Sequence, residues 1–296
     1  MRLFPYLVLT RPANVVTAIS DIIAGIAISG TFLGGIEVDI PTKIILLVLS
    51  TIGLYAGGIV FNDVFDADLD AKERPERPIP SGQVSKNSAA IFGLSLLIFG
   101  IVCAFLVSNT SGIAAVAISF FAVLYDKYGK HNQVLGPINM GICRGLNLFL
   151  GMSIVQPDQL ASLWMICLLP IVFVSAITLT SQGEVFGNNR LSIIFAMLLD
   201  IVVAGAILFM ANIGKIELLS ALPFLILWIG MNLIAKTKAI VDNVPGKIMK
   251  AVKIGVLSLI PLNACYVAGF STWMLGLAVL LLLPISILLA KKFAVT

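Results

Sequence analysis

Long apolar runs, most of them close to 20 residues, alternate with short polar segments along the whole chain. A helix that crosses the hydrocarbon core of a bilayer needs about 20 apolar residues. In lipid the backbone polar groups must be satisfied within the segment, which favours helices. We therefore expect ten membrane-spanning helices, at residues 13–34, 43–62, 88–108, 111–126, 136–155, 160–180, 191–211, 217–235, 249–269 and 272–290.

Basic residues indicate how these spans are oriented. If the N-terminus of a ten-span protein is cytoplasmic, sixteen Lys and Arg residues fall in cytoplasmic segments and two fall outside, with Arg144 inside a span. Such residues concentrate on the cytoplasmic side of membrane proteins. We therefore expect both termini in the cytoplasm, together with the polar segments 62–82, 127–135 and 181–190. The membrane is expected to be a bacterial inner (plasma) membrane.

Composition narrows the class of protein further. Hydrophobic residues make up 59% of the chain and charged residues 11%, which is typical of a polytopic membrane protein and leaves no room for a soluble domain. The net charge of +4 comes from basic residues scattered over membrane-flanking segments, so we expect no nucleic-acid partner. The four cysteines lie in apolar runs without metal-binding or disulfide spacing. The prediction is one all-α transmembrane domain over residues 1–296.

Candidate chemistry is concentrated in the acidic segment from Asn62 to Gly82. Asn62, Asp66 and Asp70 are four residues apart, so a helix through them presents all three on one face. Carboxylates at this spacing repel one another unless a cation lies between them, and their hard oxygen atoms suit Mg²⁺. Arg77 follows in a proline-rich stretch, and its guanidinium suits phosphate oxygens. A solvated acidic loop is the alternative, but this spacing favours a magnesium-bound diphosphate site.

The same segment resembles a known motif. The pattern Asn62-Asp63-x-x-Asp66-x-x-x-Asp70, followed by Arg77-Pro-Ile-Pro-Ser-Gly, resembles the first aspartate-rich motif of the UbiA superfamily of intramembrane prenyltransferases. The resemblance implies a UbiA-like bundle of nine to ten transmembrane helices, with Mg²⁺ as cofactor. It also implies a prenyl diphosphate donor and a lipid-soluble acceptor.

The segment 181–190 departs from the second motif of this family, which is Asp-x-x-x-Asp. Glu184 takes the first position and Asn188 the second, so the spacing is kept while one carboxylate is lost. An asparagine oxygen coordinates Mg²⁺ more weakly than a carboxylate. This segment and the run Gly136–Asn147 look closest to the EboC-like branch of the superfamily. We expect an acceptor that need not be aromatic and that the residues do not identify.

The resemblance also extends to residues outside the two motifs. Arg11 and Asn14 are similar to the opening helix of the family, where the asparagine lines the active-site cavity. Tyr125 and Lys130 fall where a tyrosine and a lysine help to hold the diphosphate. An interfacial aromatic residue and an ordinary cytoplasmic lysine would explain the last two equally well.

Arg144 lies in the middle of a predicted span. A charge at this depth is costly and should face the interior of the bundle. Its partner is either the substrate diphosphate or one of the two intramembrane acids, Asp21 and Asp200.

These patterns predict an enzyme that transfers a prenyl group. The expected Mg²⁺ ligands are Asn62, Asp66, Asp70, Glu184 and Asn188, of which Asp66, Asp70 and Glu184 are expected to be catalytic. The expected substrate-binding residues are Arg11, Asn14, Asp63, Arg77, Tyr125, Lys130 and Arg144. The alternative is a non-enzymatic carrier or flippase for an isoprenoid phosphate, which the intramembrane charges and the weaker second motif would suit.

Overall fold

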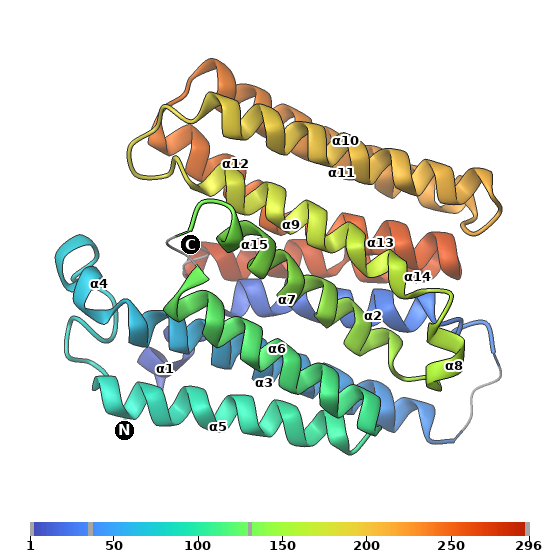
Figure 1. Cartoon of the computed structure of the whole chain (residues 1–296), viewed down its shortest axis with the longest axis horizontal. Helices are drawn as coiled ribbons and strands as arrows, with labels where there is room; N and C mark the ends of the chain where they lie inside the picture. Colours follow the sequence, from blue (N-terminus) through green and yellow to red (C-terminus); the bar gives the residue numbers. More distant parts are fainter. Residues whose placement is uncertain (1–2, 35–37, 130–131, 294–296) are drawn as a thin grey trace.

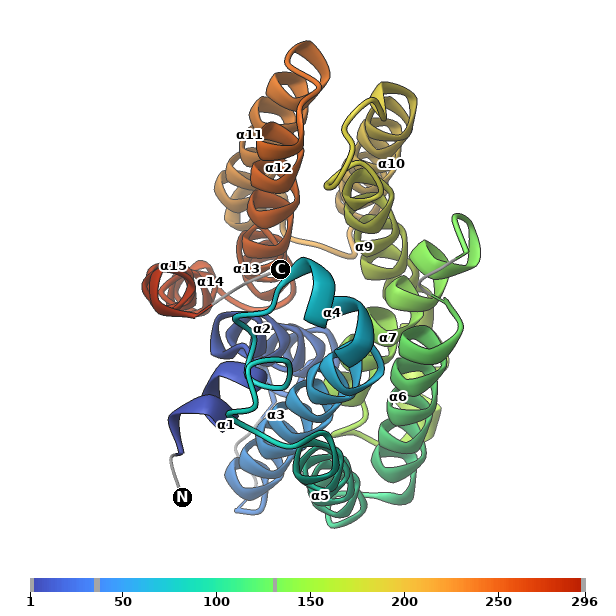
Figure 2. The same cartoon turned by 90° about the vertical axis from the view of Figure 1, so that its left-hand side faces the viewer.

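The structure is a computed structural model that describes residues 3–34, 38–129 and 132–293, and these residues form helices and connecting turns without a β-strand. Figure 1 shows the long helices running side by side along the long axis of the molecule. Figure 2 looks along these helices from one end and shows the short helix α4 lying in front of the bundle.

Most of the helices are joined by short turns. The first part of the chain contains α1 (Phe4–Leu9), α2 (Pro12–Ile28), α3 (Ile40–Phe65), α4 (Ala67–Glu73), α5 (Lys86–Phe105), α6 (Asn109–Lys127) and α7 (Leu135–Met152). The second part contains α8 (Pro157–Leu160), the 3₁₀ helix η2 (Trp164–Cys167), α9 (Leu168–Ser181), α10 (Arg190–Asn212), α11 (Leu218–Val241), α12 (Pro245–Leu257), α13 (Leu259–Phe270), α14 (Trp273–Leu280) and α15 (Leu282–Lys292).

Each predicted span overlaps one, two or three consecutive helices, which confirms the predicted all-α polytopic fold. Within the described ranges, eight helical stretches are long and apolar enough to cross a membrane by length and composition. The shorter α2 and the polar-containing α7 account for the other two predicted spans. The first span is shorter than predicted: α2 ends at Ile28, because Gly30 adopts φ +81° just after the helix, a conformation that terminates helices.

The distribution of buried residues separates central helices from peripheral ones. Of the 18 most apolar consecutive residues, 83% are buried in the α12–α13 stretch and 22% are buried in α10. Ile201, Val202 and Phe209 on α10 are exposed. Exposed apolar area on this scale is typical of a surface that contacts lipid. We infer that α10 faces the bilayer while α12–α13 supports the interior.

Helices α2 and α7 approach each other closely at the centre of the bundle. A side chain at Gly25 would collide with the backbone of Leu148, and a side chain at Gly151 would collide with the backbone of Ile22. Small residues allow this kind of backbone approach between membrane helices. The close contact brings the polar residues of α2 and α7 together beside a cavity.

Candidate functional site

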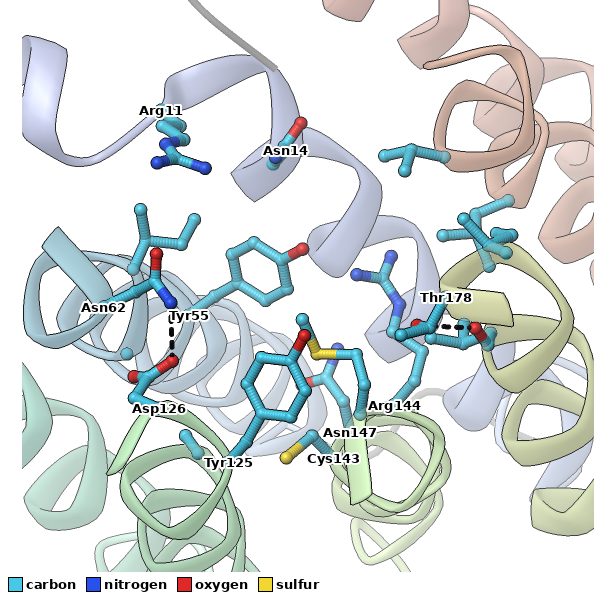
Figure 3. Close-up of a pocket in the computed structure, with 18 of the residues that line it drawn as sticks. Arg11, Asn14, Tyr55, Asn62, Tyr125, Asp126, Cys143, Arg144, Asn147 and Thr178 are labelled. Atoms are coloured by element: carbon cyan, nitrogen blue, oxygen red, sulfur yellow. Dashed lines mark hydrogen bonds between the residues drawn. The ribbon is translucent and has the colours of Figure 1, made fainter. Parts of the chain in front are cut away.

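A cavity of about 330 Å³ opens between α2, α3, α6, α7, α9 and α12 (Figure 3). Much of its polar lining comes from the ends of these helices and from the segments that follow them, at the end of the bundle where α4 lies (Figure 1), while Thr51, Arg144 and Asn147 line it from the interior of α3 and α7. Its apolar lining comes from residues further along the helices, including Leu54, Ile118, Val174 and Ile177. The cavity therefore has a polar mouth and a largely apolar body, with Arg144 and Asn147 on one wall.

The first motif keeps its predicted register, although the helix is interrupted. Helix α3 ends at Phe65, Asp66 forms the junction, and α4 begins at Ala67. Backbone hydrogen bonds from Asp66 N to Asn62 O (2.9 Å) and from Asp70 N to Asp66 O (2.8 Å) continue the helical pattern across the junction. The three side chains have different surroundings, however: Asn62 lines the cavity, Asp66 is half-buried, and Asp70 is buried outside the cavity lining.

Two arginines hold the buried carboxylates of this motif. Arg77 Nη1 donates to Asp70 Oδ2 (2.7 Å) and lies 3.3 Å from Asp63 Oδ1, which also accepts from Arg11 Nη2 (2.8 Å). This network ties α3 and α4 to the start of α2 and to the proline-rich loop. Arg11 lines the cavity, whereas Asp63, Asp70 and Arg77 do not. The network therefore places one cationic side chain at the mouth of the cavity.

A carboxylate from α6 reaches the cavity. Asp126 is buried, lines the cavity, and accepts a hydrogen bond from Asn62 Nδ2 (3.0 Å). This bond leaves the amide oxygen of Asn62 directed away from Asp126 (Figure 3). The neighbouring Tyr125 also lines the cavity, while Lys130 lies outside the described residues. The sequence patterns assigned no role to Asp126, although an acid in the last turn of a membrane helix is itself a signal.

Glu184, in the segment after α9, contributes another carboxylate to the cavity. Its side chain lines the cavity, and its Oε1 is buried without a hydrogen-bond partner among the residues that the structure describes. Burial raises the pKa of Glu184 above its usual value, while the nearby Arg74 acts in the opposite direction. Asn188 is exposed and does not line the cavity. The structure thus brings one of the two second-motif residues to the site.

The asparagines beyond Glu184 build the loop that carries it. Asn189 N donates to Asn243 Oδ1 (2.8 Å), and Asn189 Nδ2 donates to Thr180 O (2.9 Å). Asn243 in turn donates to Ala239 O (2.8 Å). The loop is therefore fixed both to the end of α9 and to the α11–α12 turn. Asn189 and Asn243 carry no motif, so sequence patterns did not single them out.

A buried polar cluster lies along one wall of the cavity. Arg144 forms an ion pair with Asp21 (Nε–Oδ2, 2.6 Å) and donates to Thr17 Oγ1 (2.9 Å). Asp21 also accepts from Asn147 (2.9 Å) and from Asn263 (2.6 Å). Among the predicted alternatives, Arg144 thus pairs with Asp21 while still lining the cavity.

Asp200, the other predicted alternative, lies elsewhere in the bundle. Its carboxylate is 2.6 Å from the ammonium of Lys236. This second intramembrane ion pair joins α10 to α11.

The oxygen atoms at the mouth suit a hard cation that is shared with a ligand. Within the described ranges, no three His, Cys, Asp or Glu side chains are grouped as a complete metal site. Asn62, Asp126 and Glu184 nevertheless line the same cavity, and one Glu184 oxygen has no partner there. Mg²⁺ is usually bound by one or two carboxylates, with water and substrate phosphates completing the shell. The arrangement fits such an ion.

Comparisons with known proteins point to one family. The model of the UbiA prenyltransferase family matches residues 23–239. A digeranylgeranylglyceryl phosphate synthase from Methanothrix thermoacetophila is 32% identical over 152 residues, which cover 51% of this chain and 55% of that protein. The matched stretch is thus little more than half the length of that relative. These similarities do not test the EboC-like branch, which stays a prediction.

Solved structures share the fold. The apo structure of a UbiA homolog from Aeropyrum pernix K1 covers 90% of this chain and 98% of its own, with a TM-score of 0.70 and 14% identity. A UbiA homolog from Archaeoglobus fulgidus bound to GPP and Mg²⁺ covers 93% of this chain and 99% of its own, with a TM-score of 0.67 and 16% identity. Because the family model matches well over half of the chain, the protein belongs to the UbiA prenyltransferase family.

Proposed function

We propose that this protein transfers a prenyl group from a Mg²⁺-bound prenyl diphosphate to a lipid-soluble acceptor. The cavity supports this proposal because it joins a polar mouth to a largely apolar body. Oxygen atoms and guanidinium groups at the mouth suit Mg²⁺ and a diphosphate. The apolar body suits a hydrocarbon chain. The Archaeoglobus fulgidus homolog, bound to GPP and Mg²⁺, supports this choice of donor and cofactor.

We assign the metal-binding role to the oxygen atoms closest to the mouth. Asn62, Asp126 and Glu184 line the cavity, and Asp66 lies at the adjacent helix junction. Bound Mg²⁺ would supply neutralisation of the charge that develops on the departing diphosphate. We assign Asp70 a supporting role, because it forms an ion pair with Arg77 (2.7 Å). Asn188 is a weaker candidate ligand because its side chain is exposed.

Cationic side chains in the cavity lining act on the diphosphate itself. Arg11, Arg74 and Arg144 line the cavity from three different segments. Fixed positive charges aimed at a group that becomes more negative stabilise the transition state without reorganisation. Asn14 and Tyr125 line the cavity as further polar contacts for the substrate.

The apolar body protects the reacting carbon atom. Loss of diphosphate from an allylic donor leaves a carbocation, which water would trap. Leu54, Ile118 and Ile177 line the cavity beyond the polar mouth. Walls of this kind exclude water until the acceptor attacks.

The acceptor and the cellular setting are inferred from the relatives and from charge. The matched relatives are named for the synthesis of digeranylgeranylglyceryl phosphate, so we place a prenylated glyceryl phosphate with a free hydroxyl first among acceptors to test. We propose that residues 1–296 form one transmembrane domain whose cavity mouth faces the cytoplasm, as the basic residues predict. The bacterial inner membrane stays our expectation for its location.

Pyrophosphate release by the purified protein tests the proposed reaction. Geranyl, farnesyl and geranylgeranyl diphosphates are supplied with the glyceryl phosphate acceptor or with a total lipid extract, with Mg²⁺ or with EDTA. We expect Mg²⁺-dependent release that requires an acceptor, together with a prenylated product seen by mass spectrometry. Mg²⁺-dependent donor binding without release under every acceptor condition would favour the carrier instead.

Loosening the Glu184 loop is expected to weaken Mg²⁺ binding without altering the carboxylate itself. Asn243→Ala removes the acceptor of the 2.8 Å bond from Asn189 N, so Glu184 is held less firmly at the cavity. We expect the Mg²⁺ concentration for half-maximal release to rise about tenfold, the range seen when groups supporting metal ligands are lost. At saturating Mg²⁺ the rate should return to near the wild-type value.

The matched control for this variant is Asn212→Ala, an asparagine at the end of α10 away from the cavity lining. An Asn243→Ala protein with unchanged Mg²⁺ dependence would show that the loop does not need this contact.

A further inference from the structure

A second cavity, of about 420 Å³, lies between α11 and α12 and is separate from the proposed reaction site. It is close to the α11–α12 turn, at the same end of the bundle as α4 (Figure 1). We call it the α11–α12 cavity. Its lining includes Ile234, Lys238, Asp242, Lys247, Lys250 and Ile254.

Charged and apolar residues occupy different levels of this cavity. Lys238 lies in the last turn of α11, and Lys247 and Lys250 lie in the first two turns of α12. Ile234 lies one turn before Lys238, and Ile254 lies one turn beyond Lys250, so both are further from the turn that joins the helices. Along the two helices, going away from the turn, the lining is therefore first cationic and then apolar. The headgroup and acyl chain of a membrane lipid follow the same order.

The lining of the α11–α12 cavity carries a net positive charge, because it contains three lysines and one aspartate. Lys238, Lys247 and Lys250 are exposed, and in the part of the chain that the structure describes none of them forms an ion pair. Lys236 differs, because it is buried and 2.6 Å from Asp200. Asp242 is the one acidic residue that the structure describes in this lining, and the N-terminus of α12 adds a partial positive charge.

We propose that the α11–α12 cavity binds an anionic phospholipid, with its phosphate among Lys238, Lys247 and Lys250 and an acyl chain against Ile234 and Ile254. Ammonium groups bind phosphate oxygens as point charges and donate hydrogen bonds to them. Basic clusters next to membrane helices attract anionic lipids in the same way. Charge complementarity selects the headgroup, and the apolar wall selects a lipid over a soluble phosphate.

Lipid retention by the full-length protein tests this site. The protein is purified in a neutral detergent, mixed with equal amounts of phosphatidylglycerol and phosphatidylcholine, and analysed by native mass spectrometry. The test variant is Lys238→Gln/Lys247→Gln/Lys250→Gln. The matched control is Lys86→Gln/Lys291→Gln/Lys292→Gln, which removes the same charge from lysines that do not line the cavity. A melting curve in detergent alone establishes that each variant is folded.

We expect wild type to retain phosphatidylglycerol in preference to phosphatidylcholine. Each lysine near an anionic surface is worth about fivefold in affinity, so the loss of three lysines should lower this preference by about a hundredfold. The control variant should keep it. Equal losses in both variants would overturn the site, since the attraction would then come from diffuse surface charge. No preference in wild type would also overturn it.

A competition experiment distinguishes a phospholipid headgroup from free inorganic phosphate as the bound group. Inorganic phosphate is added at increasing concentration while ionic strength is held constant with chloride. We expect phosphatidylglycerol to stay bound, because its acyl chain contributes contacts that the free anion lacks. Complete displacement by inorganic phosphate at equimolar concentration would show that the cavity binds the soluble anion, and the lipid proposal would fail.

Discussion

Replacing Asp66 with alanine is expected to lower Mg²⁺-dependent pyrophosphate release about a hundredfold or more. The side chain lies at the junction of α3 and α4, one helical turn from Asn62, which lines the cavity. Removing the carboxylate takes away a negative charge that we assign to Mg²⁺ binding. Loss of a single group that stabilises developing charge costs about a hundredfold to a thousandfold in rate. The measurement is the initial rate of release at saturating donor and acceptor, over a range of Mg²⁺ concentrations.

Asp68→Asn is the matched control for this experiment. Asp68 belongs to the same acidic segment, but its side chain is 97% exposed and lies 3.6 Å from Lys86, away from the cavity lining. We expect its rate to match wild type. An Asp66→Ala protein as active as Asp68→Asn would remove Asp66 from the metal site. It would leave Asn62, Asp126 and Glu184 as the proposed ligands.

Breaking the ion pair between Asp21 and Arg144 is expected to have the largest effect on stability. Both side chains are buried, at 2% and 5% exposure, and their charged atoms are 2.6 Å apart. Asp21→Asn leaves the Arg144 guanidinium in the bundle without a counter-charge. Removing one partner of a buried ion pair costs about 3–5 kcal/mol. Denaturant unfolding in detergent micelles, followed by tryptophan fluorescence, measures the loss.

Two further variants show whether the effect comes from an unpaired charge. Asp39→Asn breaks an exposed pair with Lys43 (2.6 Å), which should leave the unfolding midpoint unchanged because exposed pairs contribute little. Asp21→Asn/Arg144→Gln removes both charges and should recover much of the lost stability. If Asp21→Asn unfolds at the same midpoint as Asp39→Asn, the pair does not stabilise the bundle.

Local patterns in the sequence were sufficient to predict where the helices lie along the chain and how the residues of the first motif are spaced. Apolar runs fix where helices cross the membrane, because length and hydropathy are properties of the segment alone. The spacing of Asn62, Asp66 and Asp70 fixes their register, because neighbouring turns of a helix repeat every three to four residues. The end of α2 was the exception: Gly30 stops the helix within a stretch that stays apolar.

The partner of each charge depended on the tertiary structure. Asp63 and Asp70 belong to the motif by spacing, yet Arg11 and Arg77 hold them. Asp126 lines the cavity although no motif contains it. In the second motif, Glu184 lines the cavity, while Asn188 is exposed and Asn189 bonds to the α11–α12 turn. A spacing rule describes one helix and carries no information about what approaches it from another.

The same limit explains the intramembrane charges. The sequence predicted that Arg144 faces the interior, because a charge in lipid is costly wherever the span lies. Whether Asp21 or Asp200 pairs with it depends on which helix packs against α7. The close approach of α2, which glycines at positions 25 and 151 allow, decides for Asp21. Sequence alone determined the spans, the first-motif register and the family resemblance. Packing between distant segments decided which oxygen atoms and cations meet at the cavity, because contact energies depend on distances that no local pattern contains.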